Sequence, residues 1–293
     1  MPSAPNRWKK QLGSFLRELR KEAGKSIAEA AAQLHIQGPT LSQYESGQNR
    51  PQWASVAQLL HFYGASEAQL VEAEGRWEDA GTKTYRVRMP ADAPKDLRKL
   101  VRAEQDANLV RVLSPALIHG LLQTEPYMRA LNKGGHRFLD LAAMDEYVKA
   151  RVNRQKLLNG PDPLRLHALI DEAAIRRVIG GPQVMRQQLG HLLLTGSWTN
   201  IMIQVIPYEA GAYGPMTGPC TIVSYPEGTT APGAYVEHLA GGSWVDNEVD
   251  VGRITTTFED ACLFALSASD SADLIRQQQR ALEQYDDEDH GVA

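Results

Sequence analysis

Residues 10–75 contain five short segments in which apolar side chains recur at helical spacing, separated by glycines or capping residues. In the first segment the apolar side chains from Leu12 to Leu19 follow an i, i+3, i+4, i+7 pattern. Such closely spaced starts and stops predict a compact bundle of short helices. The first helix is expected to end at Gly24, and the second to begin with a capping box formed by Ser26 and Glu29. The third is expected over about 37–46, the fourth from Pro51 to Gly64, and the fifth from Ser66.

The second and third of these helices are predicted to form a helix-turn-helix unit. The apolar residues of the second helix are small, namely Ala28, Ala30, Ala31 and Ala32, and small side chains let the third helix approach closely. On the third helix, Leu41 and Tyr44 point toward the core, and the opposite face is polar.

The charge of the chain is unevenly distributed. The net charge is −4, but residues 1–50 carry eight Lys and Arg side chains against four Asp and Glu, which leaves residues 51–293 at −8. A net charge averaged over the whole chain therefore neither supports nor excludes a nucleic-acid partner.

The order of motifs over residues 10–75 resembles the five-helix DNA-binding domain of phage repressors, a class that includes Cro and the xenobiotic-response-element-type bacterial regulators. The motifs are Leu12-Gly13-Ser14-Phe15-Leu16-Arg17-Glu18-Leu19-Arg20, Gly24, Ser26, Ala31, Leu34, Ile36, Leu41-Ser42, Tyr44-Glu45-Ser46-Gly47 and Pro51. The resemblance implies that the N-terminal turn of the third helix enters the major groove of double-stranded DNA.

This geometry assigns candidate DNA contacts. Those expected nearest the base edges are Gln37, Gly38, Pro39, Thr40 and Gln43, and those expected at phosphates are Ser26, Ser42, Asn49, Arg50, Lys9 and Lys10. Because Gly38-Pro39 replaces polar readers and the helix has no Arg or Lys, we expect DNA shape or a second subunit to supply much of the specificity. The alternative is a helix-turn-helix that makes protein contacts alone.

The rest of the chain alternates helical and strand patterns. This alternation predicts an α+β domain over 95–285, with a small sheet flanked by helices. The DNA-binding domain is expected over 1–75, a linker over 76–94 and an acidic tail over 286–293. Expected helices are 95–107, 124–133, 140–158, 182–195, 248–267 and 270–285, and expected strands are 164–170, 200–206, 219–225, 234–238 and 243–246.

Several stretches of this part resemble the C-terminal domain of unknown function of actinobacterial regulators of the WhiJ-like group. They are Gly120-Leu121-Leu122-Gln123-Thr124, Tyr127, Arg129-Ala130, Arg151-Val152-Asn153-Arg154-Gln155, Asp171-Glu172-Ala173-Ala174-Ile175-Arg176, Gly180-Gly181, Gln188-Leu189, Gln204-Val205-Ile206-Pro207 and Tyr235-Val236-Glu237. His119 stands where that group more often has proline. The resemblance implies a regulator of development or secondary metabolism with a small acidic companion protein, and no catalytic residue.

Two features of this domain are candidate ligand or partner sites. Arg151 shares a helix face with apolar residues and must find a carboxylate if it is buried; Glu172 is the favoured partner and Asp171 the alternative. The same residues allow an effector pocket in which Arg151 or Arg154 meets an anionic ligand. The glycine-rich loop from Tyr208 to Pro219, with Tyr208 and Tyr213, is either a ligand surface or a simple connection.

Enzyme, metal and membrane functions find no support in the sequence. The phosphate-loop, zinc-protease and serine-hydrolase motifs do not occur, the eight histidines are scattered, and Cys220 and Cys262 fit neither a disulfide framework nor a metal site. No apolar run approaches the roughly 20 residues of a membrane span, and no secretory signal is visible. We expect a cytoplasmic, nucleoid-associated protein without a cofactor.

These observations together predict a homodimeric, sequence-specific transcriptional regulator. Its C-terminal domain would change DNA affinity on binding a small-molecule effector or the companion protein. The alternative is an antitoxin-like module that sequesters a partner and whose DNA binding is autoregulatory.

Overall fold

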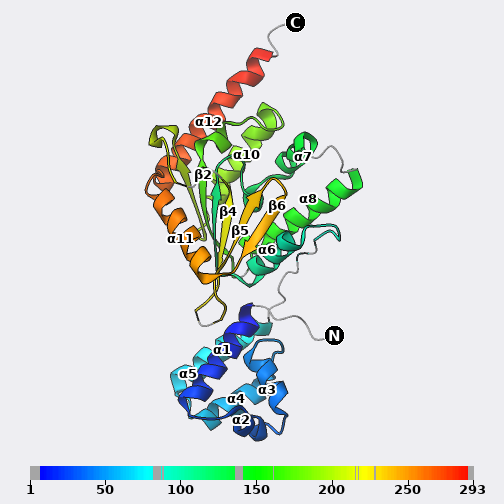
Figure 1. Cartoon of the computed structure of the whole chain (residues 1–293), viewed down its shortest axis with the longest axis vertical. Coiled ribbons are helices and arrows are strands. Elements are labelled where there is room, and N and C mark those ends of the chain that lie inside the picture. Colours follow the sequence, from blue (N-terminus) through cyan, green and yellow to red (C-terminus); the bar gives the residue numbers. More distant parts are fainter. Residues whose placement is uncertain are drawn as a thin grey trace. The chain divides into compact units, whose positions relative to one another are not determined.

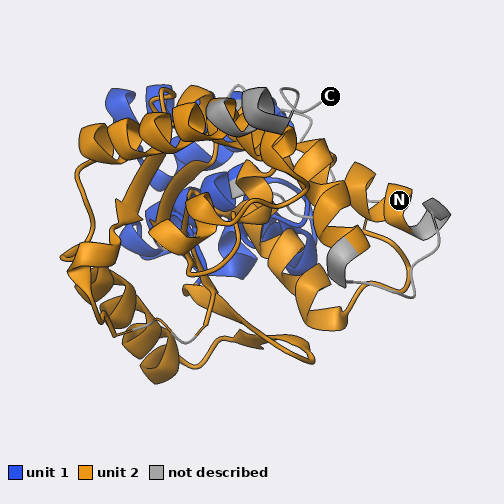
Figure 2. Ribbon diagram, turned by 90° about the horizontal axis from the view of Figure 1, so that it is seen from above, with its two compact units in different colours: residues 1–85, 225–230 blue, residues 86–224, 231–293 orange. Residues whose placement is uncertain are grey.

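The computed structural model describes residues 7–81, 87, 89–135, 141–160, 162–214, 216, 218–227 and 229–289. The chain divides into two compact units, which are coloured separately in Figure 2: residues 1–85 with 225–230 form unit 1, and residues 86–224 with 231–293 form unit 2.

Unit 1 is built on five helices (Figure 1): α1 (Arg7–Glu22), α2 (Ile27–Gln33), α3 (Gly38–Glu45), α4 (Trp53–Tyr63) and α5 (Glu67–Gly81). Its core contains the apolar side chains that the helical spacing selected, including Leu12, Leu16 and Leu41, each at most 1% exposed. Burial of each leucine side chain contributes roughly 1.5–3 kcal/mol. At α2 the expected capping box forms between Ser26 and Glu29.

Two glycines let α1 contact the end of α3 backbone to backbone. A Cβ atom on Gly13 would lie 2.5 Å from the carbonyl oxygen of Tyr44. Gly47, just after α3, has a φ of 71°, and a Cβ atom there would lie 2.6 Å from the backbone nitrogen of Lys10. Any larger residue at either position would push the two helices apart.

Helix α5 continues to Gly81, into the segment for which the sequence predicted a linker. Its last turns are held by packing: Ala80 is 2% exposed, and the Trp77 ring lies 5.6 Å from that of Trp53. The guanidinium carbon of Arg50 lies 3.7 Å from the Trp77 ring centre. Contacts with residues far away in the sequence thus extend a helix whose local pattern is weak.

Unit 2 contains a six-stranded mixed sheet in the order β3-β2-β1-β4-β5-β6. Strands β1, β2 and β3 run parallel, whereas β4, β5 and β6 pair antiparallel. Their bounds are β1 (Leu109–Ser114), β2 (Arg165–Asp171), β3 (Ile201–Ile206), β4 (Cys220–Ser224), β5 (Gly233–His238) and β6 (Gly241–Val245).

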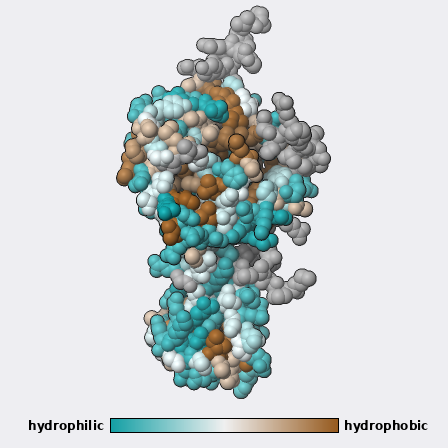
Figure 3. Space-filling view, in the orientation of Figure 1, coloured by the Kyte–Doolittle hydropathy of each residue, from teal (hydrophilic) through white to brown (hydrophobic). Residues whose placement is uncertain are grey.

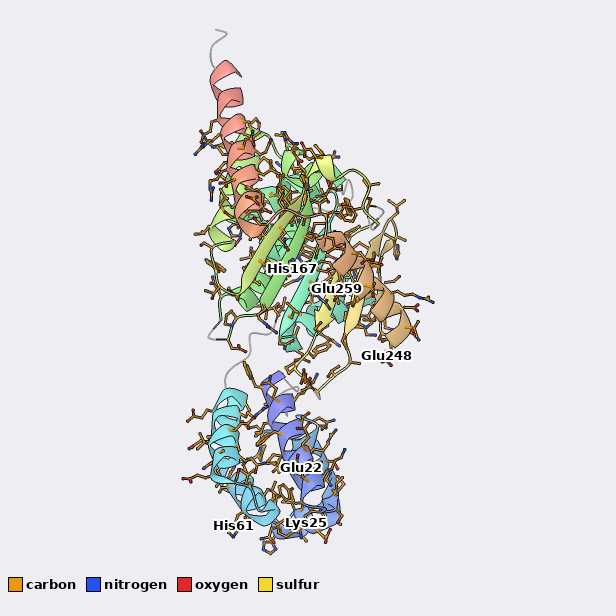
Figure 4. All side chains as sticks on the ribbon, turned by 90° about the vertical axis from the view of Figure 1, so that its left-hand side faces the viewer. Glu22, Lys25, His61, His167, Glu248 and Glu259 are labelled. Carbon is orange, nitrogen blue, oxygen red and sulfur yellow. The ribbon has the colours of Figure 1, made fainter. Side chains whose placement is uncertain are left out.

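Helices flank this sheet. They are α6 (Lys95–Asp106), α7 (Glu125–Gly135), α8 (Leu141–Gln155), α9 (Glu172–Arg176), α10 (Pro182–Thr195), α11 (Glu248–Cys262) and α12 (Ala268–Asp289), with the 3-10 turns η1 (Gly120–Leu122), η2 (Lys156–Leu158) and η3 (Tyr208–Ala210). Helix α11 covers one sheet face, on which the Phe258 ring meets the His167 ring edge-on at 5.2 Å. Figure 4 labels His167 on the sheet, and Glu248 and Glu259 on α11. Helix α6 packs against β5 and β6, and α12 packs against β3.

The predicted fold class is confirmed: a helical helix-turn-helix region precedes a domain with a six-stranded mixed sheet and flanking helices. Strand β1, which joins the parallel and antiparallel halves of the sheet, was not among the strands predicted from the sequence. Helix α12 extends to Asp289, into the expected acidic tail, of which residues 290–293 lie outside the described part. Cys220 and Cys262 are free thiols. No described helix combines the length and apolar character that a membrane span requires.

Candidate nucleic-acid interface

Helix α3 has one buried face and one accessible face. Leu41 and Glu45 are buried, at 0% and 3% exposure. Of the residues expected near base edges, Gln37 and Pro39 are exposed, whereas Gly38, Thr40 and Gln43 are half-buried; Ser42 is exposed. Gln37 is the N-cap of α3 and Pro39 lies in its first turn, so the helix starts where the capping pattern placed it.

Gln43 and Asn49 are coupled. The Asn49 side-chain amide donates to Gln43 Oε1 at 2.8 Å, and the Asn49 backbone N–H donates to the Gln43 carbonyl oxygen at 3.2 Å. These two bonds orient the Gln43 amide and leave its Nε2 hydrogens able to donate to a base. Both residues were predicted to contact DNA, and these bonds show that the structure brings their side chains together.

A buried ion pair fixes α3 against α1. Arg20 donates from Nε and Nη2 to the two carboxylate oxygens of Glu45, at 2.6 and 2.9 Å, and from Nη1 to the Lys25 carbonyl oxygen at 2.8 Å. The hydrogen bonds to Glu45 raise the pKa of Arg20. Arg20 therefore acts inside the unit, and its charge does not add to the surface that could face DNA.

The candidate phosphate contacts differ in the bonds that their side chains already make within unit 1 and in their position on the helices. Ser26 Oγ is occupied by its capping box with Glu29. Arg50 donates from Nε and Nη2 to the Trp77 carbonyl oxygen, at 3.0 and 2.7 Å, and burial lowers its pKa. Lys9 and Lys10 lie in the first turns of α1 rather than before it. The surface of this unit is largely hydrophilic in Figure 3.

In unit 2 the expected pairing of Arg151 with Glu172 or Asp171 is wrong. Arg151 Nη1 donates to Gln123 Oε1 at 3.0 Å, and no carboxylate of the described residues lies within ion-pair distance of it. The neighbouring Arg154 holds the buried carboxylate: its Nε and Nη2 donate to the two oxygens of Glu104, each at 2.5 Å. Burial raises the pKa of Glu104, and the Arg154 guanidinium counteracts that rise.

Glu172 and Asp171 instead hold the loop after β3. Glu172 accepts from Arg176 Nε at 2.5 Å and from the Tyr208 backbone N–H at 2.7 Å. Asp171 accepts the Tyr213 hydroxyl at 2.7 Å, and burial, followed by this hydrogen bond, raises the pKa of Tyr213.

Four of the five candidate ligand or partner residues of unit 2 line two separate cavities. Arg151 and Arg154 line a cavity of about 990 Å³, whereas Tyr208 and Tyr213 line one of about 310 Å³. The fifth, Glu172, is in the lining of neither and accepts from the Tyr208 backbone N–H. Tyr213 is buried at 4% exposure and Tyr208 is 55% exposed. Glu104 and His119 were not predicted from the sequence. Glu104 pairs with Arg154, and His119 lines the larger cavity close to both arginines.

A metal centre finds no support within the described ranges, since they contain no group of three or more His, Cys, Asp or Glu side chains arranged to hold an ion.

The comparisons with protein families agree with this division of the chain. Residues 11–73 match the family described as a helix-turn-helix domain, and residues 97–277, more than half of the chain, match the domain of unknown function DUF5753. No curated protein and no solved structure matches the chain. The helix-turn-helix domain indicates a DNA-binding regulator rather than an enzyme. The chain belongs to the DUF5753 family, in an arrangement in which a helix-turn-helix domain precedes the family's domain.

Proposed function

We propose that the protein is a sequence-specific regulator of transcription that inserts the start of α3 into the major groove of double-stranded DNA. The observation that carries this proposal is the accessible polar face of α3, from Gln37 to Gln43, opposite the buried Leu41 and Glu45. The rigid attachment of α3 to α1 through Glu45 supports it, because a fixed helix positions its base contacts reproducibly.

Direct readout rests on few side chains. Gln43 can donate to a base edge from an amide that Asn49 already orients, and Thr40 lies one turn earlier on the same helix. Gly38 and Pro39 offer no side-chain hydrogen bond, so sequence-dependent DNA shape supplies the remaining specificity.

The double variant Thr40→Ala/Gln43→Ala tests this assignment. We expect operator affinity to fall at least about 10-fold, since each lost base contact costs about 1–3 kcal/mol. The operator is first selected from a random duplex pool with the unmodified full chain, and affinity is then measured by fluorescence anisotropy at fixed salt. Gln277→Ala, an exposed glutamine on α12, is the matched control. Unchanged operator affinity in the double variant contradicts direct readout by α3.

The regulator is proposed to bind as a homodimer, with Lys9 and Lys10 of each copy at phosphates. For Lys9→Gln/Lys10→Gln we expect the slope of log affinity against log salt to become shallower by about 2 per bound domain, hence by about 4 for a dimer. The measurement is a salt titration of operator binding. Lys133→Gln/Lys149→Gln, two exposed lysines of unit 2, matches the charge change and should leave the slope unaltered. No change of the slope refutes the lysine contacts, and a change of about 2 refutes the combination of a dimer with both lysines at phosphates.

We also propose that unit 2 controls DNA affinity by binding a small-molecule effector or a small companion protein. The cavity beside Arg151 supports the effector route, because a concave site with mostly apolar walls and a few polar groups suits a small ligand. The motifs that resemble xenobiotic-response-element-type and WhiJ-like regulators of actinobacteria support a role in development or secondary metabolism, exercised in the cytoplasm at the nucleoid.

A further inference from the structure

The larger cavity of unit 2 lies where several distant segments of the chain meet. Its volume is about 990 Å³, at the upper end of the roughly 300–1,000 Å³ of ligand sites. It is lined by residues of α6, α7 and α8, which lie on the same side of the sheet in Figure 1, and by the loop 115–120 that follows β1. Residues 177–180, after α9, and Glu237 of β5 complete it.

The loop that forms the floor of this cavity is held by three glutamine side chains. Gln123 donates to the Ile118 carbonyl oxygen at 2.6 Å, and Gln155 donates to the carbonyl oxygens of Gly120 and Gln123 at 3.0 and 2.6 Å. Gln188 donates to the Leu122 carbonyl oxygen at 2.7 Å. The site is therefore formed before any ligand arrives, which reduces the entropy lost on binding.

Arg151 enters this cavity with most of its hydrogen-bonding capacity unused. A guanidinium has five N–H donors, and among the described residues Arg151 gives one hydrogen bond, to Gln123 Oε1. Burial lowers the pKa of Arg151, and the positive charge of the nearby Arg154 lowers it further. Arg154, in contrast, has its charge matched by Glu104. A cation held in place and short of partners is suited to a planar anion, which it can bind through two parallel bonds.

The remaining ionisable groups of the lining leave it with an excess of positive charge. Arg177 adds a second guanidinium, and Glu237 adds one carboxylate. Burial raises the pKa of Glu237, although Arg154 and Arg151 counteract the rise. His119 is neutral, because burial lowers its pKa well below the usual value and both arginines lower it further. Within the part of the chain that the structure describes, Arg151 and Arg177 form no ion pair, so two guanidiniums of the lining stand against one carboxylate.

An amide side chain belongs to the same lining. Asn132 on α7 is 7% exposed and lines the cavity. Its amide can both donate a hydrogen bond to a ligand and accept one from it. The apolar lining residues of the cavity include Leu97, Leu117, Leu131 and Ile179.

We propose that this cavity binds a small amphiphilic molecule with a carboxylate group, whose carboxylate pairs with Arg151 and whose apolar body lies along Leu97, Leu131 and Ile179. Asn132 would bond to a further polar atom of the ligand. The inference deepens the proposed control of DNA affinity by an effector, and names the chemistry of that effector.

Octanoate, octylamine, 1-octanol and acetate form a probe series that separates the anionic group from the apolar body. Binding to the full chain is measured by calorimetry without DNA, so the result does not depend on whether α3 recognises an operator. We expect octanoate to bind at least about 10-fold more tightly than octylamine, and acetate not to bind measurably. For Arg151→Gln we expect octanoate to bind about 10- to 100-fold more weakly, with 1-octanol unchanged. Octylamine binding as tightly as octanoate overturns the proposal.

Matched variants guard against a trivial loss of folding. Arg102→Gln, on the exposed side of α6, removes the same charge outside the cavity and should leave octanoate binding intact. Ala116→Trp places an indole at an exposed lining position and should weaken octanoate and 1-octanol together. Circular dichroism verifies folding of each variant. Octanoate binding that survives Ala116→Trp, or a folded Arg151→Gln variant with unaltered octanoate affinity, refutes the assignment.

Discussion

Replacing Glu45 by alanine is expected to lower the free energy of unfolding of unit 1 by about 3–5 kcal/mol. Arg20 is 8% exposed, and Glu45 accepts both of its strongest hydrogen bonds. Without the carboxylate, the guanidinium stays buried with only the Lys25 carbonyl oxygen as an acceptor. A small domain has a total stability of only about 5–15 kcal/mol, so much of the unit would unfold near physiological temperature.

Hydrogen exchange resolved by peptide is the suitable measurement, because it reports α1 to α5 separately from unit 2. Glu72→Ala is the control: Glu72 also pairs with an arginine, Arg76, but the two side chains are 47% and 34% exposed, so solvent screens the pair and its loss costs less than about 1 kcal/mol. Arg20→Met/Glu45→Leu should recover most of the stability, since an apolar pair can replace a buried ion pair. Equal protection in Glu45→Ala and Glu72→Ala would show that the pair does not stabilise the unit.

The helices of unit 1 could be predicted because their signals are local. The spacing from Leu12 to Leu19, the box at Ser26 and Glu29, and the glycines after the first, third and fourth helices are read within one or two turns. The candidate DNA contacts on α3 follow from the same periodicity, once Leu41 is placed inward. The coupling of Gln43 to Asn49 was not predictable, because it depends on how the chain turns after the helix.

Unit 2 was harder because its decisive contacts are distant in sequence. In β1 the run Leu109–Leu113 is short and mostly apolar, and such a run fits a strand or the end of a helix equally well. Only its pairing with β2 and β4 settles it as a central strand. The sequence predicted a carboxylate partner for Arg151, and this was wrong, because Arg151 bonds to the Gln123 amide. The carboxylate that enters this region is Glu104 of α6, which lies 50 residues before its partner Arg154 and could not be assigned from local spacing.

Replacing Glu104 by alanine is expected to destabilise unit 2 by about 3–5 kcal/mol. Glu104 is 1% exposed and Arg154 6% exposed, and the two parallel hydrogen bonds between them tie α6 to α8. Loss of the carboxylate leaves a guanidinium charge deep in the protein, next to Arg151 and a neutral His119. Since α6 and α8 both line the larger cavity, the variant should also lose octanoate binding as the cavity walls separate.

The pair Arg111–Glu259 of the same unit provides the comparison, because the Arg111 side chain is 17% exposed but that of Glu259, labelled in Figure 4, is 62% exposed. Since solvent reaches the Glu259 carboxylate and screens the pair, Glu259→Ala should cost clearly less than Glu104→Ala in the same peptide-resolved exchange experiment. Glu104→Leu/Arg154→Met should restore much of the stability, because no charge then remains buried without a partner. Because Arg154 is already neutralised in the native protein, that double variant should still bind octanoate through Arg151. If the double variant folds but does not bind octanoate, the anion binds at Arg154 instead. If Glu104→Ala is as stable as Glu259→Ala, the Glu104–Arg154 pair does not stabilise the packing of α6 against α8.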